Sequence, residues 1–281
     1  MTIGFVGLGN IGRPMAKNLL KLGETVCVYD VATAAVDELV GLGAQRAASI
    51  AELGRACRVV GLCVRDDKDV NELLYGAEGL LETLAIDTVV AIHSTVTQAS
   101  ILQWAKDAAQ KNLHVIDAPI TGGASGAAAG TLCYMVGGPG EIVERCRPVF
   151  ETSAQKIIHA GALGAGIALK LCNNLMTYAA FAAIHEAAAL AHASGLALDL
   201  LIEVGRSNGV VTPQMQAFIE NRSHMSAAGT DVLVKNFGPF AALGKKDLAA
   251  ALASAAQLNL RLPLTAGLVE TIEDAFFDRV S

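Results

Sequence analysis

Short apolar runs alternate with amphipathic stretches along the first half of the chain. The runs are rich in β-branched residues and are bounded by glycine or polar residues, which is typical of strands. The stretches between the early runs, Arg13–Leu22 and Thr33–Leu42, have the period of a helix. This alternation predicts a doubly wound, mostly parallel sheet, whose central strands are apolar because both faces are buried. The predicted strands are Ile3–Val6, Thr25–Tyr29, Val59–Val64, Thr88–Ile92, His114–Asp117 and Leu132–Val136.

The second half of the chain shows helical periodicity instead. Positions from Ile167 to Ser194 form one long helical pattern, and no run after residue 160 resembles a strand. Gly161, Gly164 and Gly166 mark the change and predict a hinge. We therefore predict an α/β dinucleotide-binding domain at residues 1–161 and an all-helical domain at residues 162–281. The other predicted helices are Leu198–Ser207, Val211–Arg222, Asp231–Asn236, Lys246–Leu258 and Pro263–Phe277.

The composition is that of an apolar globular chain. Of 281 residues 53% are hydrophobic and 17% charged, with a formal net charge of −6. This balance argues against nucleic-acid binding, which normally uses a basic face. The mean hydropathy of +0.45 is high, but the longest apolar stretch, Leu175–Ala191, contains His185 and Glu186. A membrane span needs about 20 residues with few or no charges. We therefore expect a buried helix of a soluble protein and no membrane contact.

The chain start and the cysteines predict a cytoplasmic protein without a metal. Residues 1–8 begin directly with a strand pattern, and no basic segment with a small-residue cleavage site precedes it. None of the six cysteines forms a Cys-x-x-Cys pair, and no two histidines have the spacing of zinc ligands. Free, buried thiols in a reducing compartment are the expectation.

A glycine motif follows the first predicted strand. Gly7-Leu8-Gly9-Asn10-Ile11-Gly12 matches G-x-G-x-x-G and opens the helical pattern at Arg13. In such a motif the first glycine allows a tight turn, the second lets a pyrophosphate approach, and the third lets helix and strand pack closely. The helix start then offers free N–H groups to phosphates. The motif alone is a weak signal among 28 glycines, and its position between strand and helix strengthens it.

Asp30 ends the second predicted strand, about 20 residues beyond the first glycine, where an acid binds the ribose hydroxyls in dinucleotide sites. A carboxylate there repels a 2′-phosphate, so Asp30 predicts NAD over NADP. A turn or capping aspartate is the structural alternative. Flavin can use the same turn, but no further flavin signature is present.

A second glycine-rich segment follows the strand at 114–117. Thr121-Gly122-Gly123 would leave backbone N–H groups exposed in a loop, and such a concavity can hold a carboxylate. An ordinary glycine-rich turn explains the same residues, and the segment alone does not decide between the two.

Lys170 is unusual because it lies in a very apolar helix and is followed by Asn173 and Asn174 on or near its face. A buried amine loses its proton more readily than an exposed one, so Lys170 is a candidate general acid/base. A lysine that extends its amine to solvent at the helix edge is the alternative.

Lys246, in Lys245-Lys246-Asp247, could reach an anionic cofactor. We expect these residues to open a helix, with Asp247 complementing its N-terminus. A solvated charge pair is the alternative there.

Taken together, the chain resembles the β-hydroxyacid dehydrogenase family, which includes 3-hydroxyisobutyrate dehydrogenase and tartronate semialdehyde reductase. The resemblance covers nearly the whole chain and rests on four motifs in order. They are Gly7–Gly12 with Pro14–Leu19, Asp117–Gly123, Lys170–Asn174 and Lys246–Leu248. It implies a Rossmann-type domain, a helical domain built on a long interdomain helix, a site in the cleft between the domains, and a homodimer or homotetramer.

The resemblance also implies roles for individual residues. Lys170 matches the catalytic lysine of the family, and Asn174 matches its substrate-contacting asparagine. The loop that binds the substrate carboxylate is matched by Thr121, Gly122 and Gly123. Cofactor contacts are implied for Gly7, Leu8, Gly9, Asn10, Ile11, Gly12, Asp30, Val64, Arg65, Thr95 and Lys246.

Three departures from the family pattern matter. Thr121 stands where serine is common, which keeps the hydroxyl but adds a methyl group. Val64-Arg65 replaces a usual Leu-Pro, so Arg65 adds a charge near the cofactor; a surface arginine paired with Asp66 or Asp67 is the alternative. The Asn-Arg of many NADP-using relatives is absent at Asp30-Val31, which favours NAD.

The expected activity is hydride transfer between NAD and a small 3-hydroxy acid, or its 3-oxo acid or semialdehyde. An imine reductase-like enzyme of the same fold and a non-catalytic NAD-binding protein are the alternatives. A short-chain dehydrogenase is disfavoured because no tyrosine has a lysine four residues later. A phosphogluconate dehydrogenase is disfavoured because it needs a larger helical domain.

Overall fold

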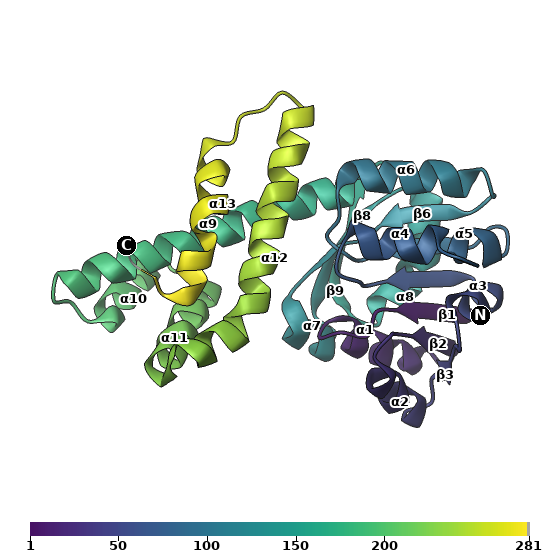
Figure 1. The fold of residues 1–281 in the computed structure, drawn as a ribbon, viewed down its shortest axis with the longest axis horizontal. Helices are drawn as coiled ribbons and strands as arrows, with labels where there is room; N and C mark the ends of the chain where they lie inside the picture. Colours follow the sequence, from purple (N-terminus) through teal and green to yellow (C-terminus); the bar gives the residue numbers. More distant parts are fainter. Residues whose placement is uncertain (280–281) are drawn as a thin grey trace. The chain divides into compact units, whose positions relative to one another are not determined.

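The structure is a computed structural model that describes residues 1–279 (Figure 1). The chain divides into two compact units: Met1–Lys170, and the residues from Leu171 onward. The first unit holds a nine-stranded sheet flanked by helices, and the described part of the second unit is helical. We call them the nucleotide unit and the helical unit.

The sheet has the order β3-β2-β1-β4-β5-β6-β8-β7, and β9 also pairs with β8. The pairs from β3 to β6 are parallel, and β8 runs antiparallel to β6 and β7. All six predicted strands are present, so the doubly wound, mostly parallel sheet is confirmed. They are β1 (Thr2–Val6), β2 (Thr25–Tyr29), β4 (Val59–Leu62), β5 (Val89–Ile92), β6 (His114–Asp117) and β8 (Leu132–Gly137).

Three strands have no counterpart in the sequence analysis. β3 (Gln45–Arg46) and β7 (Ile120–Thr121) have two residues each, which is too short for an apolar run. β9 (Ala154–Gly161) is longer, but five of its eight residues are exposed and none is buried, so its sequence lacks an apolar pattern.

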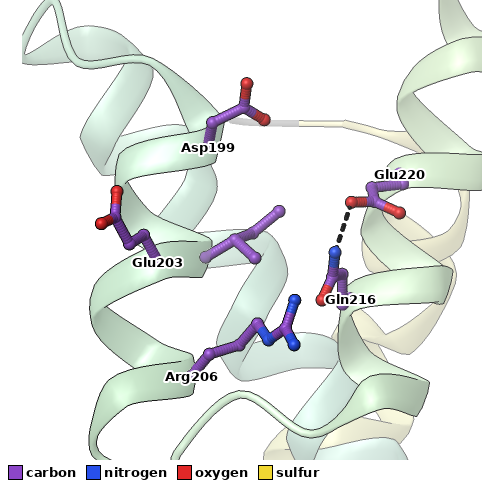
Figure 2. Close-up of a pocket in the computed structure, with 6 residues that line it drawn as sticks. Asp199, Glu203, Arg206, Gln216 and Glu220 are labelled. Carbon is purple, nitrogen blue, oxygen red and sulfur yellow. Dashed lines mark hydrogen bonds between the residues drawn. The ribbon is translucent and has the colours of Figure 1, made fainter.

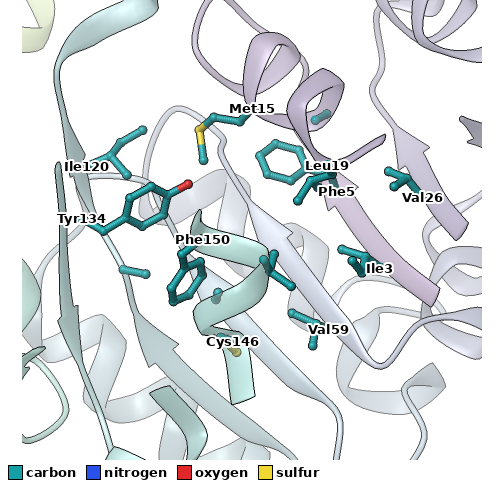
Figure 3. Packing of buried hydrophobic residues seen from close by; sticks show 14 of the residues in the cluster. Ile3, Phe5, Met15, Leu19, Val26, Val59, Ile120, Tyr134, Cys146 and Phe150 are labelled. Atoms are coloured by element: carbon teal, nitrogen blue, oxygen red, sulfur yellow. The ribbon is translucent and has the colours of Figure 1, made fainter. Parts of the chain in front are cut away.

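Two apolar cores fill the two faces of this sheet. Successive residues of a strand point to opposite faces, and accordingly Phe5 of β1 belongs to one core and Val6 to the other. Figure 3 shows the first core, in which Tyr134 and Phe150 stack with ring centroids 5.0 Å apart.

The helices of this unit are α1 (Gly12–Leu19), the short η1 (Leu20–Leu22), α2 (Thr33–Gly41), α3 (Ile50–Ala56), α4 (Asp67–Tyr75), α5 (Leu80–Thr83), α6 (Gln98–Ala109), α7 (Gly123–Ala129) and α8 (Gly140–Glu151).

One helix, α9 (Ala165–Ala193), begins in the nucleotide unit and continues into the helical unit. Its length and composition alone would allow it to cross a membrane, and 33% of its most apolar window is buried. Our expectation of a buried helix is therefore met along one face only, since Met176 and Leu190 are exposed.

The helical unit continues with α10 (Leu198–Ser207), α11 (Pro213–Ala228), α12 (Thr230–Gln257) and α13 (Pro263–Phe277). Its core contains an aromatic cluster in which Phe181 stacks on Phe218, 4.3 Å between centroids. The two helices predicted at 231–236 and 246–258 are a single helix, α12, so that prediction was wrong. Pro239 lies inside α12, and Gly244 is needed there because an added Cβ would come 2.9 Å from the Tyr178 ring.

Candidate active site

Five neighbouring strands of the nucleotide unit end in one row. Tyr29, Val6, Leu62, Ile92 and Asp117 are paired across β2, β1, β4, β5 and β6. In an open parallel sheet, ligands bind beyond this carboxyl edge, where the strand order reverses; here the reversal is at β1. The structure brings most predicted cofactor residues to this edge. Directly beyond the row, or in the loops that start there, are Asp30, the 7–12 loop, Val64, Arg65, Thr95 and the 121–123 loop.

The glycine loop has the shape that a dinucleotide requires. Gly7 has a φ of 92°, and an added Cβ would lie 2.3 Å from the carbonyl oxygen of Cys63. A Cβ on Gly12 would lie 1.9 Å from the carbonyl oxygen of Gly7. Gly9 has nothing within 4 Å of an added Cβ. The first and third glycines are thus required by the protein's own packing, whereas the second leaves open the space that a pyrophosphate would enter, so the loop fits NAD or NADP.

The Asp30 side chain is hydrogen-bonded to the backbone of this loop. Its Oδ2 accepts a hydrogen bond from the Leu8 backbone N–H, and its Oδ1 accepts one from the Ala32 N–H at 2.7 Å. The second bond is the turn geometry that we considered as the structural alternative. The first bond places the carboxylate beside the glycine loop, so the residue serves the turn and also presents a negative charge next to the candidate cofactor site.

Ser94 joins the loops that follow β4 and β5. Its Oγ accepts from the Val64 N–H at 2.9 Å and donates to the Val64 carbonyl at 2.8 Å. One step further, Thr97 caps α6 and its hydroxyl donates to Asp67 Oδ1 at 2.9 Å. These contacts hold Val64 and the segment containing Thr95 in one arrangement. The sequence analysis assigned a role to Thr95 and none to Ser94.

Arg65 is bound to the helix that follows it, α4. Its Nε and Nη2 both donate to the Asp69 carboxylate at 2.7 Å, and its side chain is 85% exposed. The guanidinium lowers the pKa of Asp69 through these hydrogen bonds. Arg65 is thus the surface arginine of our alternative, but its hydrogen-bonded partner is Asp69. Asp66, one of the two partners that we named, caps α4 by accepting from the Asp69 N–H.

His93, which precedes Ser94, is buried and uncharged at neutral pH. Burial lowers its pKa to about 4. Its Nδ1 lies 3.0 Å from the Ala118 carbonyl, an acceptor, so this nitrogen carries the proton. The ring stacks on Phe5 with centroids 5.9 Å apart. His93 therefore acts as an uncharged aromatic side chain that packs against Phe5 beneath the carboxyl edge of the sheet.

The cysteines are free, but they are not all buried as we expected. Cys27, Cys57 and Cys146 are buried, whereas Cys63 and Cys133 are half-buried and Cys172 is exposed. Desolvation raises the pKa of Cys63, beside the glycine loop, to about 12, so this thiol stays protonated.

The second glycine segment forms an open turn. Thr121 ends β7 opposite Cys133 of β8, and Gly122 and Gly123 follow with φ values of 124° and 64°. Such positive values suit glycine. An added Cβ on Gly123, the first residue of α7, meets nothing within 4 Å, so the turn is open on this side. The turn has room for a ligand at its amide groups.

Three polar side chains recur every four residues along α9. Lys170, Asn174 and Tyr178 therefore share one face of the helix, and each is at most 9% exposed. In the helical unit, Asn174 Nδ2 donates to Asp247 Oδ2 at 2.7 Å, and the Tyr178 hydroxyl donates to the same oxygen at 3.3 Å. Burial and the Asp247 charge raise the pKa of Tyr178 well above its usual range.

Asp247 is a site residue whose role the sequence analysis missed. It lies inside α12 and is 2% exposed, so it does not complement a helix N-terminus as we predicted. Its Oδ1 lies 3.5 Å from Lys246 Nζ, so it joins two of the predicted site residues, Asn174 and Lys246. The available signal was the spacing of Asn174 and Tyr178, two polar groups on one apolar helix face that need a buried partner.

A polar pocket elsewhere in the helical unit contains none of the predicted residues. It has a volume of about 320 Å³ and lies between α10 and α11 (Figure 2). Its charged groups are Asp199, Glu203, Arg206 and Glu220, and the Gln216 amide donates to Glu220 at 2.8 Å. Three carboxylates and a single arginine line this pocket, which does not suit an acidic substrate.

Comparison with known families and proteins places both units. Residues 2–161 match the family described as the NAD-binding domain of 6-phosphogluconate dehydrogenase. Residues 164–276 match the family described as the NAD-binding domain of NADP-dependent 3-hydroxyisobutyrate dehydrogenase. A relative from Pseudomonas aeruginosa, named 3-hydroxyisobutyrate dehydrogenase, is 38% identical over 277 residues, which covers 94% of this chain and 88% of the relative.

Solved structures extend these similarities to the fold. The 3-hydroxyisobutyrate dehydrogenase of Mycobacterium tuberculosis, determined with L-serine, superposes with a TM-score of 0.81 at 30% identity and covers 97% of this chain and 92% of its own. An imine reductase of Streptomyces aurantiacus superposes with a TM-score of 0.69 at 21% identity, covering 99% and 96%. At that identity the second likeness concerns the fold alone.

Proposed function

This chain belongs to the 3-hydroxyisobutyrate dehydrogenase family of nicotinamide-dependent oxidoreductases, and we propose that it interconverts a small 3-hydroxy acid and its 3-oxo acid or semialdehyde with NAD. Lys170 is the general acid/base in this proposal. The observation that carries it is the buried polar face of α9, where Lys170 precedes by one turn an asparagine whose amide is held by Asp247. A helix with a merely structural role would not need three buried polar groups there.

Lys170, Asn174 and Asp247 would have different roles in the proton transfer. In oxidation, the uncharged Lys170 amine takes the hydroxyl proton, and in reduction the ammonium returns it to the forming hydroxyl. NAD, when bound, supplies the acceptor for the hydride. Asn174 Nδ2 is committed to Asp247. The carbonyl oxygen of the same amide accepts from Asn173 Nδ2 at 3.3 Å, and its second lone pair can accept from the substrate hydroxyl or from Lys170. Asp247 thus orients an acceptor for the reacting group.

Binding of the substrate carboxylate falls to Thr121, Gly122 and Gly123. The turn's positive φ values and the open space at Gly123 support this role. Backbone N–H groups in such a turn can hold a carboxylate without a cation. The methyl group of Thr121 then narrows the pocket for the substrate's side chain, compared with the serine found in many relatives.

NAD is the proposed cofactor, and the position of Asp30 supports it. The carboxylate lies against the glycine loop, where it would accept hydrogen bonds from the ribose hydroxyls and repel a 2′-phosphate. The proposed contacts are the 7–12 loop, Asp30, Val64, Arg65, Thr95 and Lys246. We expect an affinity at least about tenfold higher for NAD than for NADP, equivalent to about 1.4 kcal/mol.

A cytoplasmic homodimer or homotetramer is part of the same proposal. Large apolar side chains exposed on the helical unit support self-association, because soluble monomers rarely expose extended apolar patches. Those on α9 and α10 are Met176, Leu190, Leu200 and Val204.

The first test is a substrate panel combined with one variant. We would assay 3-hydroxyisobutyrate, L-serine and glycerate with NAD and NADP, following nicotinamide absorbance. Lys170→Ala should lower kcat with the best acid by about 10²- to 10⁴-fold, the usual contribution of a general acid/base. Its dissociation constant for NAD should stay within about threefold, because the variant leaves the glycine loop intact.

Lys245→Ala is the matched control. This lysine is 49% exposed and pairs with Glu273 at 3.7 Å, so its removal should leave kcat unchanged. Near-normal turnover by Lys170→Ala would remove the lysine from the reaction. Reduction of a cyclic imine, without turnover of any acid in the panel, would overturn the assignment to hydroxy acids.

A further inference from the structure

A buried carboxylate holds the start of the helix that carries Lys170. Asp117, the last residue of β6, is fully buried. Its Oδ1 accepts from the Gly164 N–H at 2.8 Å, and its Oδ2 accepts from the Ile167 N–H at 2.7 Å. These N–H groups belong to the beginning of α9, where a helix has no internal acceptors for them. The side-chain cap of α9 thus comes from a distant strand, while the Ala165 N–H donates to the carbonyl of the preceding Ala162.

The fit around this carboxylate is close on two sides. A Cβ on Gly137 would lie 2.4 Å from Asp117 Oδ1, and a Cβ on Gly166 would lie 2.9 Å from Oδ2. The Gly166 Cβ would also come 2.3 Å from the Met135 carbonyl oxygen, so the first turn of α9 lies directly on β8. Gln98 adds a hydrogen bond to the Gly164 carbonyl at 3.2 Å. The helix start therefore has little freedom to slide or rotate.

The charge of Asp117 suits this position. Burial raises the pKa of its carboxyl, while the hydrogen bonds from the helix backbone favour the charged form. A negative charge at a helix N-terminus also interacts favourably with the helix dipole. An asparagine at this position has a single acceptor oxygen, so it could satisfy only one of the two N–H groups.

We propose that Asp117 is a positioning residue for the reaction. By capping α9 from the sheet, it fixes how far the helix can shift along its axis and rotate about it, and so it fixes the position of Lys170, which lies within one turn of Ile167. After Asp117 the chain continues directly into β7 and the turn at Thr121–Gly123. One carboxylate therefore fixes both the proton-transfer group and the start of the loop for the substrate carboxylate. The inference rests on the proposed function, in which Lys170 exchanges the proton.

The test compares two variants that loosen the same contact from opposite sides. Asp117→Asn removes one acceptor, and Gly166→Ala pushes the first turn of α9 away from β8. Each should lower kcat by about 10- to 100-fold, because small misplacements of a reacting group have effects of this size. The dissociation constant for NAD and the KM for the acid should stay within about threefold. The acid used is the one in the panel above that the wild-type protein turns over fastest.

Two measurements separate positioning from loss of fold. kcat is expressed per titrated NAD-binding site, so unfolded protein does not contribute. Ser153→Ala is the control, because it removes another buried hydrogen bond of the nucleotide unit, to the Tyr134 hydroxyl at 2.8 Å. It should lower Tm without changing kcat per site. The double variant Asp117→Asn/Gly166→Ala should have a smaller effect than the product of the single effects, since both release one contact.

The outcomes distinguish this inference from the proposed function. Loss of turnover in Lys170→Ala, combined with wild-type kcat per site in Asp117→Asn and Gly166→Ala, overturns the positioning role alone. Wild-type turnover in Lys170→Ala, or no turnover of any acid by the wild-type protein, overturns both. If Asp117→Asn does not fold, Gly166→Ala decides the question.

Discussion

The two units hold their candidate site residues in different ways. In the nucleotide unit the backbone is decisive: Gly7, Gly9 and Gly12 shape a loop, and Gly122 and Gly123 shape a turn. In the helical unit side chains are decisive, because Asp247 of α12 holds Asn174 and Tyr178 of α9; we call these three residues the Asp247 cluster. A backbone site depends on where side chains are absent, whereas a side-chain site depends on which partners meet across two helices.

We expect the two units to differ in their tolerance to substitution for this reason. A Cβ added at a required glycine collides with carbonyl groups, which cannot move without disturbing a strand. A partner lost from the Asp247 cluster leaves the helices in place but lets an amide turn. We therefore expect substitutions in the 7–12 glycine loop to act on folding and cofactor binding, and substitutions in the Asp247 cluster to act on kcat.

The largest effect is expected for Gly12→Ala, compared with Gly9→Ala. The added Cβ at 12 would lie 1.9 Å from the Gly7 carbonyl oxygen, so we expect destabilisation by at least about 4 kcal/mol. At Gly9 the space is open, so Gly9→Ala should keep its Tm and lose NAD affinity by about tenfold or more. Thermal unfolding and a fluorescence titration with NADH measure the two effects. Equal Tm values for the two variants would contradict the packing argument.

A smaller effect is expected in the helical unit for Asp247→Asn. The new amide keeps one acceptor oxygen for the Asn174 NH₂ group but loses the negative charge and the second oxygen beside Lys246, so the hydrogen bond that orients Asn174 becomes weaker. We expect kcat to fall by about 100-fold with little change in Tm or in NAD affinity. Tyr178→Phe is the control; it keeps the ring and removes only the 3.3 Å contact, so kcat should change by less than about threefold. A kcat near wild type for Asp247→Asn would show that side-chain orientation in this unit does not matter.

Lowering the pH should reduce the folding stability of both units, because each contains a buried histidine. His93 and His185 are buried, and burial lowers the pKa of each, to about 4 for His93. The unfolded chain, with a histidine pKa of about 6.5, therefore binds more protons, and stability falls as pH drops below about 6.5. For His93 the loss between pH 7.5 and pH 5 is about 2 kcal/mol.

His93→Gln tests this pH dependence. The variant should lose about 2 kcal/mol less than the wild-type protein between those two pH values in urea unfolding, whatever its stability at pH 7.5. His192→Gln, at an exposed position, should follow the wild-type curve. Parallel curves for His93→Gln and the wild-type protein would mean that His93 carries no pH-dependent stability.

The sequence predicted the sheet well because its strands are buried on both faces and their apolar runs are continuous. It missed β9, whose residues are largely exposed, and it divided α12 at Gly238-Pro239 and Gly244, since it could not show the Tyr178 ring packed against Gly244. Among the site residues, the glycine motif and Asp30 were found from local spacing. The partners Asp247 and Asp69 were not, because their contacts depend on side-chain placement and not on motif spacing.

The contact around Asp117 has a consequence for directed evolution. Positions 117, 137 and 166 occupy one volume that a single carboxylate fills. A library that varies one of them at a time should favour the parental residue, because a side chain added at 137 or 166 collides with that carboxylate. Joint randomisation of all three offers a way to remodel the base of the catalytic helix, for example by exchanging the acid for a smaller group while a glycine gains a side chain.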